Sequence, residues 1–196
     1  MRPSNGALRV ALTGGPGAGK TTAADLLRRE VGDEIVVVPE SATMLFGSGF
    51  PRSDEPPARR WAQNAIFHAQ RGLEEVYREM YPHRVLLCDR GTIDGAAYWP
   101  GETDDFFTAM ETTLDDELAR YDRVIFFETA AVGGESIEGG NPVRNETLER
   151  AVELDAKLRR LWSRHPHFTM VHHDKSFLAK IFNALAVLKK VVDGHA

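Results

Sequence analysis

The glycine-rich segment at residues 14–21, Gly-Gly-Pro-Gly-Ala-Gly-Lys-Thr, constrains this chain more than any other part of its sequence. An apolar run precedes it at 8–13, and apolar residues at helical spacing follow it. The pattern G-x-x-x-x-G-K-[ST] between a strand and a helix is typical of a loop that binds phosphate groups. Glycines let backbone amides approach a polyphosphate, and the helix N-terminus adds partial positive charge. We therefore expect a nucleotide site here, rather than a glycine-rich turn with no ligand.

Individual positions of this loop have separate expected roles toward Mg-ATP. Lys20 is suited to bridging the β- and γ-phosphates, the Thr21 hydroxyl to binding Mg²⁺, and Thr22 to reaching the α-phosphate. The chain has no Asn-Lys-x-Asp string that would read guanine, which favours ATP without excluding GTP. The residues expected to contact the nucleotide are Gly14, Gly15, Pro16, Gly17, Ala18, Gly19, Lys20, Thr21 and Thr22.

Five short apolar runs alternate with helical patterns along the chain. Their nearly continuous hydrophobicity is typical of parallel strands that are buried on both faces. We therefore expect an α/β fold in which helices cover both faces of a five-stranded parallel sheet. The runs lie at residues 8–13, 35–38, 85–88, 124–127 and 168–172.

A carboxylate, Asp89, directly follows the third apolar run. Ligands of open α/β sheets collect at the carboxyl ends of the strands, so we expect Asp89 to be a second anchor for magnesium. The alternative is an aspartate that only caps the next segment. Cys88 lies one residue earlier and is expected to be a small core side chain rather than a reactive thiol.

Two further segments have helical apolar spacing. The helix that begins at the Pro56-Pro57 pair is expected to bury one apolar face against the core. A second face of this helix is expected either to line a cleft or to be an ordinary, partly exposed surface. The inward face comprises Trp61, Ala65, Ala69, Leu73, Val76 and Met80, and the second face Gln63, Phe67 and Gln70. In the terminal helix the expected buried stripe is Leu178, Ile181, Phe182, Leu185 and Leu188.

Composition limits the classes of partner. The 196 residues carry a net charge of −5, and the basic residues form no run, so neither a nucleic-acid track nor a membrane patch is expected. One cysteine allows no intrachain disulfide, and the longest apolar stretches are far below the roughly 18 residues that span a bilayer. We expect one cytoplasmic domain over residues 1–196, and a homodimer stays open.

Two short segments add a family resemblance. These are Val-Val-Val-Pro-Glu at 36–40 and Asp-Arg-Gly at 89–91. With the glycine-rich loop they resemble the deoxyribonucleoside kinases, in which the second strand ends in Pro-Glu and the third in an acidic residue followed by Arg. The string Asp-Arg-Gly-Thr-Ile-Asp-Gly-Ala-Ala-Tyr at 89–98 is similar to a family of small AAA-type ATP-binding proteins related to nicotinamide riboside kinase domains. The resemblance implies the three-layer P-loop fold with strand order 2-3-1-4-5. It also implies transfer of the ATP γ-phosphate to a hydroxyl of a small molecule, for example a nucleoside-like one.

The resemblance also implies residue roles. Glu40 would be the general base that takes the proton of the acceptor hydroxyl, although it could instead cap the segment from Ser41. Arg90 would neutralise charge on the transferred group or hold Glu40, with a purely structural salt bridge as the alternative. Gln63 would contact the acceptor. A stacking wall could come from aromatic residues that could equally be core side chains, namely Phe46, Trp61 and Phe67.

A glycine-rich segment after the fourth run corresponds to the lid of such kinases, at about 130–145. Its Arg144 would reach the γ-phosphate. Glu135 and Glu138 fit a lid poorly, so an ATP- or GTP-binding regulatory NTPase or switch with slow hydrolysis is the competing interpretation. A DNA-handling AAA ATPase would need a second domain for which the chain is too short. The His172-His173 pair is expected to be structural, because two histidines alone make no metal site.

Overall fold

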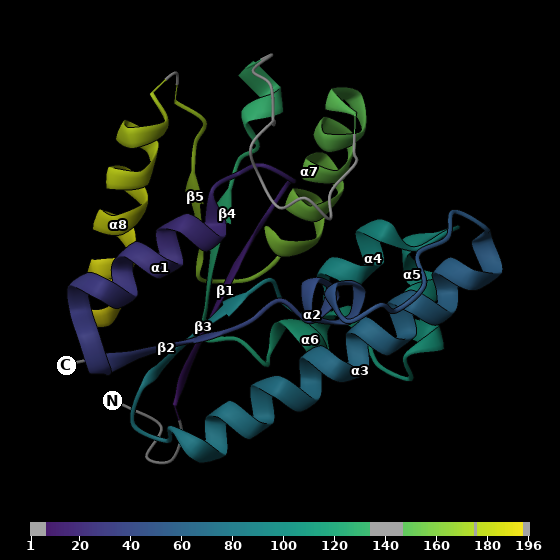
Figure 1. Ribbon diagram of the computed structural model, residues 1–196, viewed down its shortest axis with the longest axis horizontal. Coiled ribbons are helices and arrows are strands. Elements are labelled where there is room, and N and C mark those ends of the chain that lie inside the picture. Colours follow the sequence, from purple (N-terminus) through teal and green to yellow (C-terminus); the bar gives the residue numbers. More distant parts are fainter. Residues whose placement is uncertain (1–6, 134–146, 175, 194–196) are drawn as a thin grey trace.

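The computed structural model describes residues 7–133, 147–174 and 176–193. Five parallel strands form one sheet in the order β2-β3-β1-β4-β5, which confirms the predicted α/β fold and strand order (Figure 1). The strands lie within a residue of the predicted runs. Their bounds are β1 Leu8–Gly14, β2 Ile35–Val38, β3 Val85–Asp89, β4 Arg123–Phe127 and β5 Phe168–Val171.

Helices cover both faces of the sheet (Figure 1). On one face, α1 and α8 pack against apolar side chains of β1, β3 and β4. On the other face, α3 to α7 enclose a larger apolar cluster. The helices are α1 Lys20–Val31, α2 Ser41–Gly47, α3 Pro56–Met80, α4 Asp94–Tyr98, α5 Thr103–Ala109, α6 Leu114–Leu118, α7 Leu148–Trp162 and α8 Phe177–Asp193, with 3-10 turns η1 Gly32–Glu34 and η2 Ala130–Gly133.

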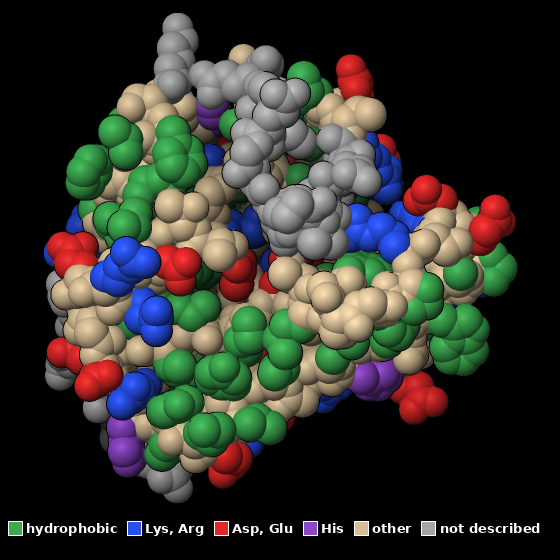
Figure 2. All heavy atoms as spheres, viewed as in Figure 1, with side chains coloured by type: hydrophobic (Ala, Val, Ile, Leu, Met, Phe, Trp, Pro, Cys, Tyr) green, Lys and Arg blue, Asp and Glu red, His purple; other side chains and the backbone are tan. Residues whose placement is uncertain are grey.

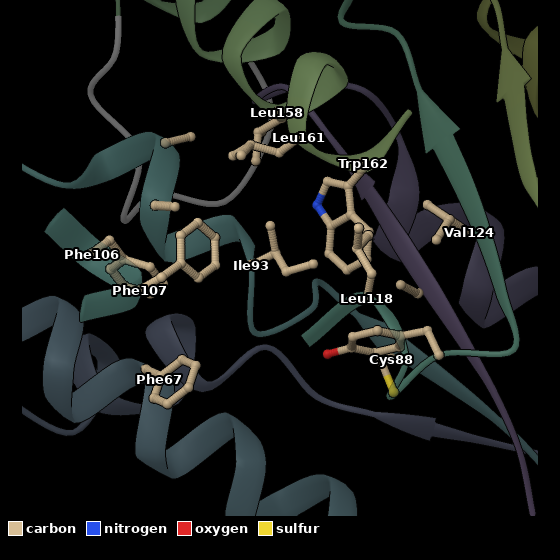
Figure 3. Close-up of a cluster of buried hydrophobic side chains, with 14 of the residues drawn as sticks. Phe67, Cys88, Ile93, Phe106, Phe107, Leu118, Val124, Leu158, Leu161 and Trp162 are labelled. Atoms are coloured by element: carbon tan, nitrogen blue, oxygen red, sulfur yellow. The ribbon is translucent and has the colours of Figure 1, made fainter. Parts of the chain in front are cut away.

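The larger cluster joins α7 to the segment that follows β3. Figure 3 shows Trp162 of α7 lying between Ile93 and the sheet residue Val124. Trp162 and Ile93 are fully buried. Cys88 lies in the same cluster as a fully buried free thiol, the core position predicted for it. This packing fixes the start of the chain segment that leaves β3 toward α4.

The strand register brings the carboxyl ends of the neighbouring strands β2, β3, β1 and β4 to one edge of the sheet. Leu12 pairs with Asp89, and Gly14 pairs with Phe127. Val38, the last residue of β2, pairs with Cys88. Because parallel strands share one direction, the segments that leave β1, β2 and β3 emerge side by side at this edge.

The predicted inward face of α3 is wrong in part, because Leu73 packs against the larger cluster but three other members of that face are exposed. Trp61, Val76 and Met80 are 74%, 54% and 60% exposed. Hydrophobic side chains accordingly gather on the surface over α3 (Figure 2). The residues that α3 buries are Ala62, Phe67, Gln70 and Glu74.

Buried ion pairs explain this orientation of α3. Glu74 is fully buried and receives hydrogen bonds from Arg9 at 3.3 Å, Arg120 at 2.8 Å and the Tyr121 hydroxyl at 2.7 Å. Burial raises the pKa of Glu74, and the bonds from Tyr121 and Arg120 oppose that rise. Two cations and a hydroxyl thus satisfy a carboxylate inside the protein, which apolar periodicity alone does not reveal.

The predicted stripe of α8 is also wrong in part. Leu178 and Phe182 are 67% and 69% exposed, whereas Ile181, Ala184 and Leu188 are buried in the cluster with α1. The helix packs mainly on α1, so one narrow row of side chains meets the core. Within the described part of the chain, no helix combines the length and apolar character needed to cross a membrane.

We predict that Gly91→Ala destabilises the fold. A Cβ at this position would lie 2.6 Å from the Trp162 ring and 2.9 Å from the Tyr121 hydroxyl, two large buried groups. Overpacking of this kind costs about 1–3 kcal/mol. Urea unfolding measures the loss. The matched control is Gly72→Ala in α3, where a Cβ meets nothing within 4 Å and the helix should gain about 0.5–1 kcal/mol. Equal stability of the two variants would contradict this packing.

Candidate active site

The loop between β1 and α1 is closed around the Lys20 side chain. Lys20 is buried, and its Nζ donates to the carbonyl oxygens of Gly14 and Gly15, both at 2.9 Å. Gly14 has φ +130°, and a Cβ there would lie 2.0 Å from the Phe127 carbonyl oxygen. Only glycine fits this position, which explains the first glycine of the motif.

A second set of contacts ties this loop to β4 and α7. Asp155 of α7 accepts hydrogen bonds from the backbone N–H groups of Gly15 and Thr129, both at 2.9 Å. The Thr129 hydroxyl donates to the Pro16 carbonyl at 2.5 Å. Burial raises the pKa of Asp155, and the two backbone donors oppose that rise. Nothing in the sequence marks Asp155 as functional, because it lies within an ordinary charged helical pattern.

Thr21 and Asp89 meet beside this loop. The Thr21 hydroxyl donates to Asp89 Oδ2 at 2.6 Å. The other carboxylate oxygen, Oδ1, is buried and has no hydrogen-bond partner among the described residues. Burial and the nearby Glu40 carboxylate raise the pKa of Asp89, so a cation placed beside it would favour its ionised form.

Arg90 connects the ends of β2 and β3 with α4. Its Nε contacts Glu40 Oε1 at 2.6 Å, and its Nη1 contacts Asp94 Oδ2 at 2.8 Å. The backbone of Arg90 has φ +71°, an uncommon value for a non-glycine residue, and its N–H donates to the Leu12 carbonyl at 2.9 Å. Burial works against its charge, but interactions with Tyr98, Glu40 and Asp94 raise the pKa of its guanidinium above the usual value.

Asp94 is a buried member of this cluster for which the sequence predicts no role. Its Oδ1 accepts hydrogen bonds from the Thr13 hydroxyl at 2.8 Å and from Trp162 Nε1 at 2.7 Å. Both carboxylate oxygens of Asp94 are therefore occupied by donors from β1, α7 and Arg90. The only sequence feature that could have pointed to Asp94 is its place in the family-like string at 89–98. Its hydrogen-bond partners Thr13 and Trp162 lie in distant parts of the sequence.

Glu40 is fixed at the start of α2. The Thr43 hydroxyl donates to its Oε2 at 2.6 Å, opposite the contact with Arg90. Behind it, Gln70 Oε1 accepts the N–H of Ser41 at 3.0 Å, while Gln70 Nε2 donates to the Arg90 carbonyl at 3.4 Å. Gln70 is buried, so it links the segments after β2 and β3 instead of lining a cleft as one alternative expected.

A cavity of about 490 Å³ opens in front of these residues. Its lining comes from α2, α3, α4, the first two turns of α7 and the segment 52–54. The charged residues Glu40, Arg90 and Asp94 line it with side chains that are at most 12% exposed. A space of this volume fits a small-molecule ligand.

The structure brings some of the other predicted side chains to this cavity and not others. Gln63 and Phe46 line it. Phe67 does not, because it is 1% exposed and packs edge-on against Phe106 in the core, so its expected contact with a substrate is wrong. Trp61 lies on the protein surface away from it. Arg144 and residues 134–146 of the expected lid lie outside the described residues.

The histidine pair after β5 contacts the segment that follows β4. The His173 N–H donates to Glu128 Oε2 at 2.8 Å, and His172 Nδ1 lies 3.6 Å from the same oxygen. Nearby, Lys180 of α8 donates to the Glu128 carbonyl, and burial lowers the pKa of Lys180 to about 8. Over the described ranges, no cluster of three or more His, Cys, Asp or Glu could hold a metal ion.

Solved kinase structures share this fold at low sequence identity. Deoxyadenosine kinase from M. mycoides with bound dATP aligns at a TM-score of 0.62 and 16% identity, over 93% of this chain and 99% of that chain. The same enzyme with bound dCTP gives 0.63 and 15%, over 93% and 100%. Shikimate kinase from Acinetobacter baumannii in complex with shikimate gives 0.54 and 17%, over 96% and 94%. Identities this low establish the fold alone.

No curated protein sequence matches the chain. A family model described as an AAA domain matches residues 9–177, which include the glycine-rich loop and all five strands. That match, the loop geometry and the strand order agree with one another. The chain therefore belongs to this AAA domain family, as a P-loop nucleotide-binding domain with a kinase-like fold.

Proposed function

We propose that the protein is a phosphotransferase that moves the γ-phosphate of ATP to a hydroxyl of a small molecule. One observation carries this proposal: the Glu40 carboxylate, which is 12% exposed, lines a cavity of about 490 Å³, and Arg90 joins it to the P-loop edge of the sheet. A slow regulatory NTPase has no need of a separate cavity that ends in an oriented carboxylate. Both structural neighbours are named as kinases of small molecules.

The relation of the cavity to the P-loop supports transfer between two bound molecules. Arg90 Nη1 lies 3.5 Å from the Gly14 carbonyl oxygen and also contacts Asp94 in the cavity wall. Arg90 thus borders both the phosphate-binding loop and the cavity. A hydroxyl held near Glu40 would face the end of a triphosphate held by the loop.

In the proposed step, the acceptor oxygen forms a bond to the γ-phosphorus as the bond from that phosphorus to the bridging oxygen of ADP breaks. Glu40 accepts the proton of the hydroxyl. Thr43 and Arg90 hold the carboxylate in one orientation, and the Arg90 charge stabilises the equatorial oxygens of the transferred group. Lys20 and the P-loop amides orient the triphosphate.

Thr21 and Asp89 are the residues that would hold Mg²⁺. Magnesium takes oxygen ligands, and these side chains place a hydroxyl and a carboxylate 2.6 Å apart at the P-loop. The buried Asp89 Oδ1, which has no hydrogen-bond partner among the described residues, fits a cation. When bound, the ion would neutralise phosphate charge. Gln63, which lines the cavity, would contact the acceptor.

We predict that Glu40→Gln retains ATP binding but lowers phosphoryl transfer by at least about a hundredfold, because an amide cannot accept the proton. Transfer is measured as ADP release in the presence of magnesium and a set of small hydroxylated metabolites, with the phosphorylated product identified by mass spectrometry. Calorimetry with a non-hydrolysable ATP analogue reports nucleotide binding.

The matched control for this variant is Glu79→Gln at the exposed end of α3, which should transfer phosphate at the normal rate. Full activity of Glu40→Gln would show that Glu40 is not the base. Slow ADP release that no metabolite stimulates would instead support the regulatory NTPase.

We predict that Lys20→Ala weakens ATP binding by roughly tenfold to a hundredfold, the scale of losing a hydrogen bond from a charged group, and that transfer falls with it. Calorimetry measures the affinity, and thermal unfolding checks that the variant is folded. Lys157→Ala on the exposed side of α7 is the control. Normal turnover by a folded Lys20→Ala protein would overturn the proposed phosphate site.

A further inference from the structure

The charged side chains that line the cavity form two groups. We call Glu40, Arg90 and Asp94 its floor; their side chains are at most 12% exposed. The floor contains two carboxylates and one guanidinium that contacts both of them, so its net charge is −1. The rest of the charged lining, which we call the rim, comprises Arg52, Asp54, Arg59 and Arg150.

Arg59 is the rim residue best placed to bind a ligand. It lies in the first turns of α3, half-buried, and its Nη2 donates to the Tyr98 carbonyl at 2.8 Å. That bond orients the guanidinium toward the end of α4. Among the described residues, Arg59 forms no ion pair with a carboxylate within 4.0 Å. The guanidinium is fixed in the cavity wall, and it has N–H groups besides the one that bonds to Tyr98. Such a group is suited to binding a carboxylate or a phosphate.

The other charged residues of the rim contribute less than Arg59. Arg150, in the first turn of α7, contacts Glu153 at 2.6 Å, so its charge is largely offset although Glu153 does not line the cavity. The Arg52 side chain is exposed, and its guanidinium lies 4.4 Å from the centre of the Phe46 ring. Asp54 is exposed as well, and exposed charges interact weakly in water.

We infer that the acceptor carries an anionic group, a carboxylate or a phosphate, at a distance from the hydroxyl that receives the phosphoryl group, and that Arg59 binds that anion. This inference rests on the proposed function and names its substrate class. The negative floor repels an anion from Glu40, while the Arg59 guanidinium attracts it. The charge pattern therefore orients the acceptor with its hydroxyl toward Glu40 and excludes the reversed orientation.

The test uses matched pairs of compounds that differ in one anionic group. For the carboxylate, glycerol is compared with glycerate and glucose with gluconate. For the phosphate, ribose is compared with ribose 5-phosphate, and deoxyadenosine with its 3′-monophosphate. Calorimetry measures the binding of each compound to protein saturated with magnesium and a non-hydrolysable ATP analogue. Steady-state kinetics with ATP then gives kcat and KM for each compound that binds.

We expect at least one anionic member to bind more tightly than its neutral partner by about tenfold or more, and Arg59→Gln to remove that preference. The loss should appear as a roughly tenfold to hundredfold rise in Kd and KM for the anionic member, with kcat little changed. Affinity for the ATP analogue should stay the same. Arg78→Gln, on the exposed end of the same helix, is the matched control and should retain the preference.

Three outcomes would overturn the inference. These are equal binding of neutral and anionic members throughout the set, an anion preference that survives in Arg59→Gln, and an equal loss of affinity for the ATP analogue in that variant. The last result would assign Arg59 to the nucleotide. If binding is anion-selective and depends on Arg59 but no phosphorylated product forms, the anion site stands and the proposed transfer fails.

Discussion

The buried contacts of Arg90 with Glu40 and Asp94 determine how the parts of this site are arranged. Two segments that leave the sheet at one edge meet at this guanidinium, because Glu40 follows β2, whereas Arg90 and Asp94 lie on the segment that runs from β3 into α4. Arg90 adopts a left-handed backbone conformation to do so, which costs on the order of 1 kcal/mol or more for a non-glycine residue. The N–H bond to Leu12 and the two carboxylates offset that cost. Without this cation, two buried carboxylates would face each other uncompensated.

Polar side chains behind the site hold that arrangement in place. Gln70 joins the backbone after β2 to the backbone after β3, and Glu74 lies next to it in a group of ion pairs beneath the sheet. Asp94 is held from the other side by Trp162, which packs in the core next to Gly91. Buried polar groups are costly unless their partners are correctly placed, so these contacts favour one geometry over its alternatives. The floor of the cavity is therefore rigid, whereas its rim is more exposed.

The charge pattern of the cavity follows from where the chain places each arginine. Arg90 is offset by two carboxylates, whereas Arg59 has only a backbone carbonyl near it. Arg59 thus keeps a positive charge in the cavity wall although the whole chain carries −5. Overall composition argues against a basic surface for nucleic acid but could not reveal a local site for a small anion. Such a site depends on the pairing of a few side chains and contributes little to the net charge.

The sequence by itself determined the P-loop and the five strands, because these depend on local patterns: a glycine motif of fixed spacing, and short apolar runs that only a doubly covered parallel sheet can bury. The order of the strands was implied by the family resemblance, and the structure confirms it. The sequence also marked Glu40, Asp89 and Arg90, which lie at or just after the carboxyl ends of strands. The tertiary structure decided which face of α3 is buried, since the ion pairs of Glu74 outweigh the apolar stripe through Trp61. Only the tertiary structure revealed the roles of Asp94, Asp155 and Arg59. Their hydrogen-bond partners come from segments far away in the chain, and the local spacing of residues in a sequence does not show which distant residues they will contact.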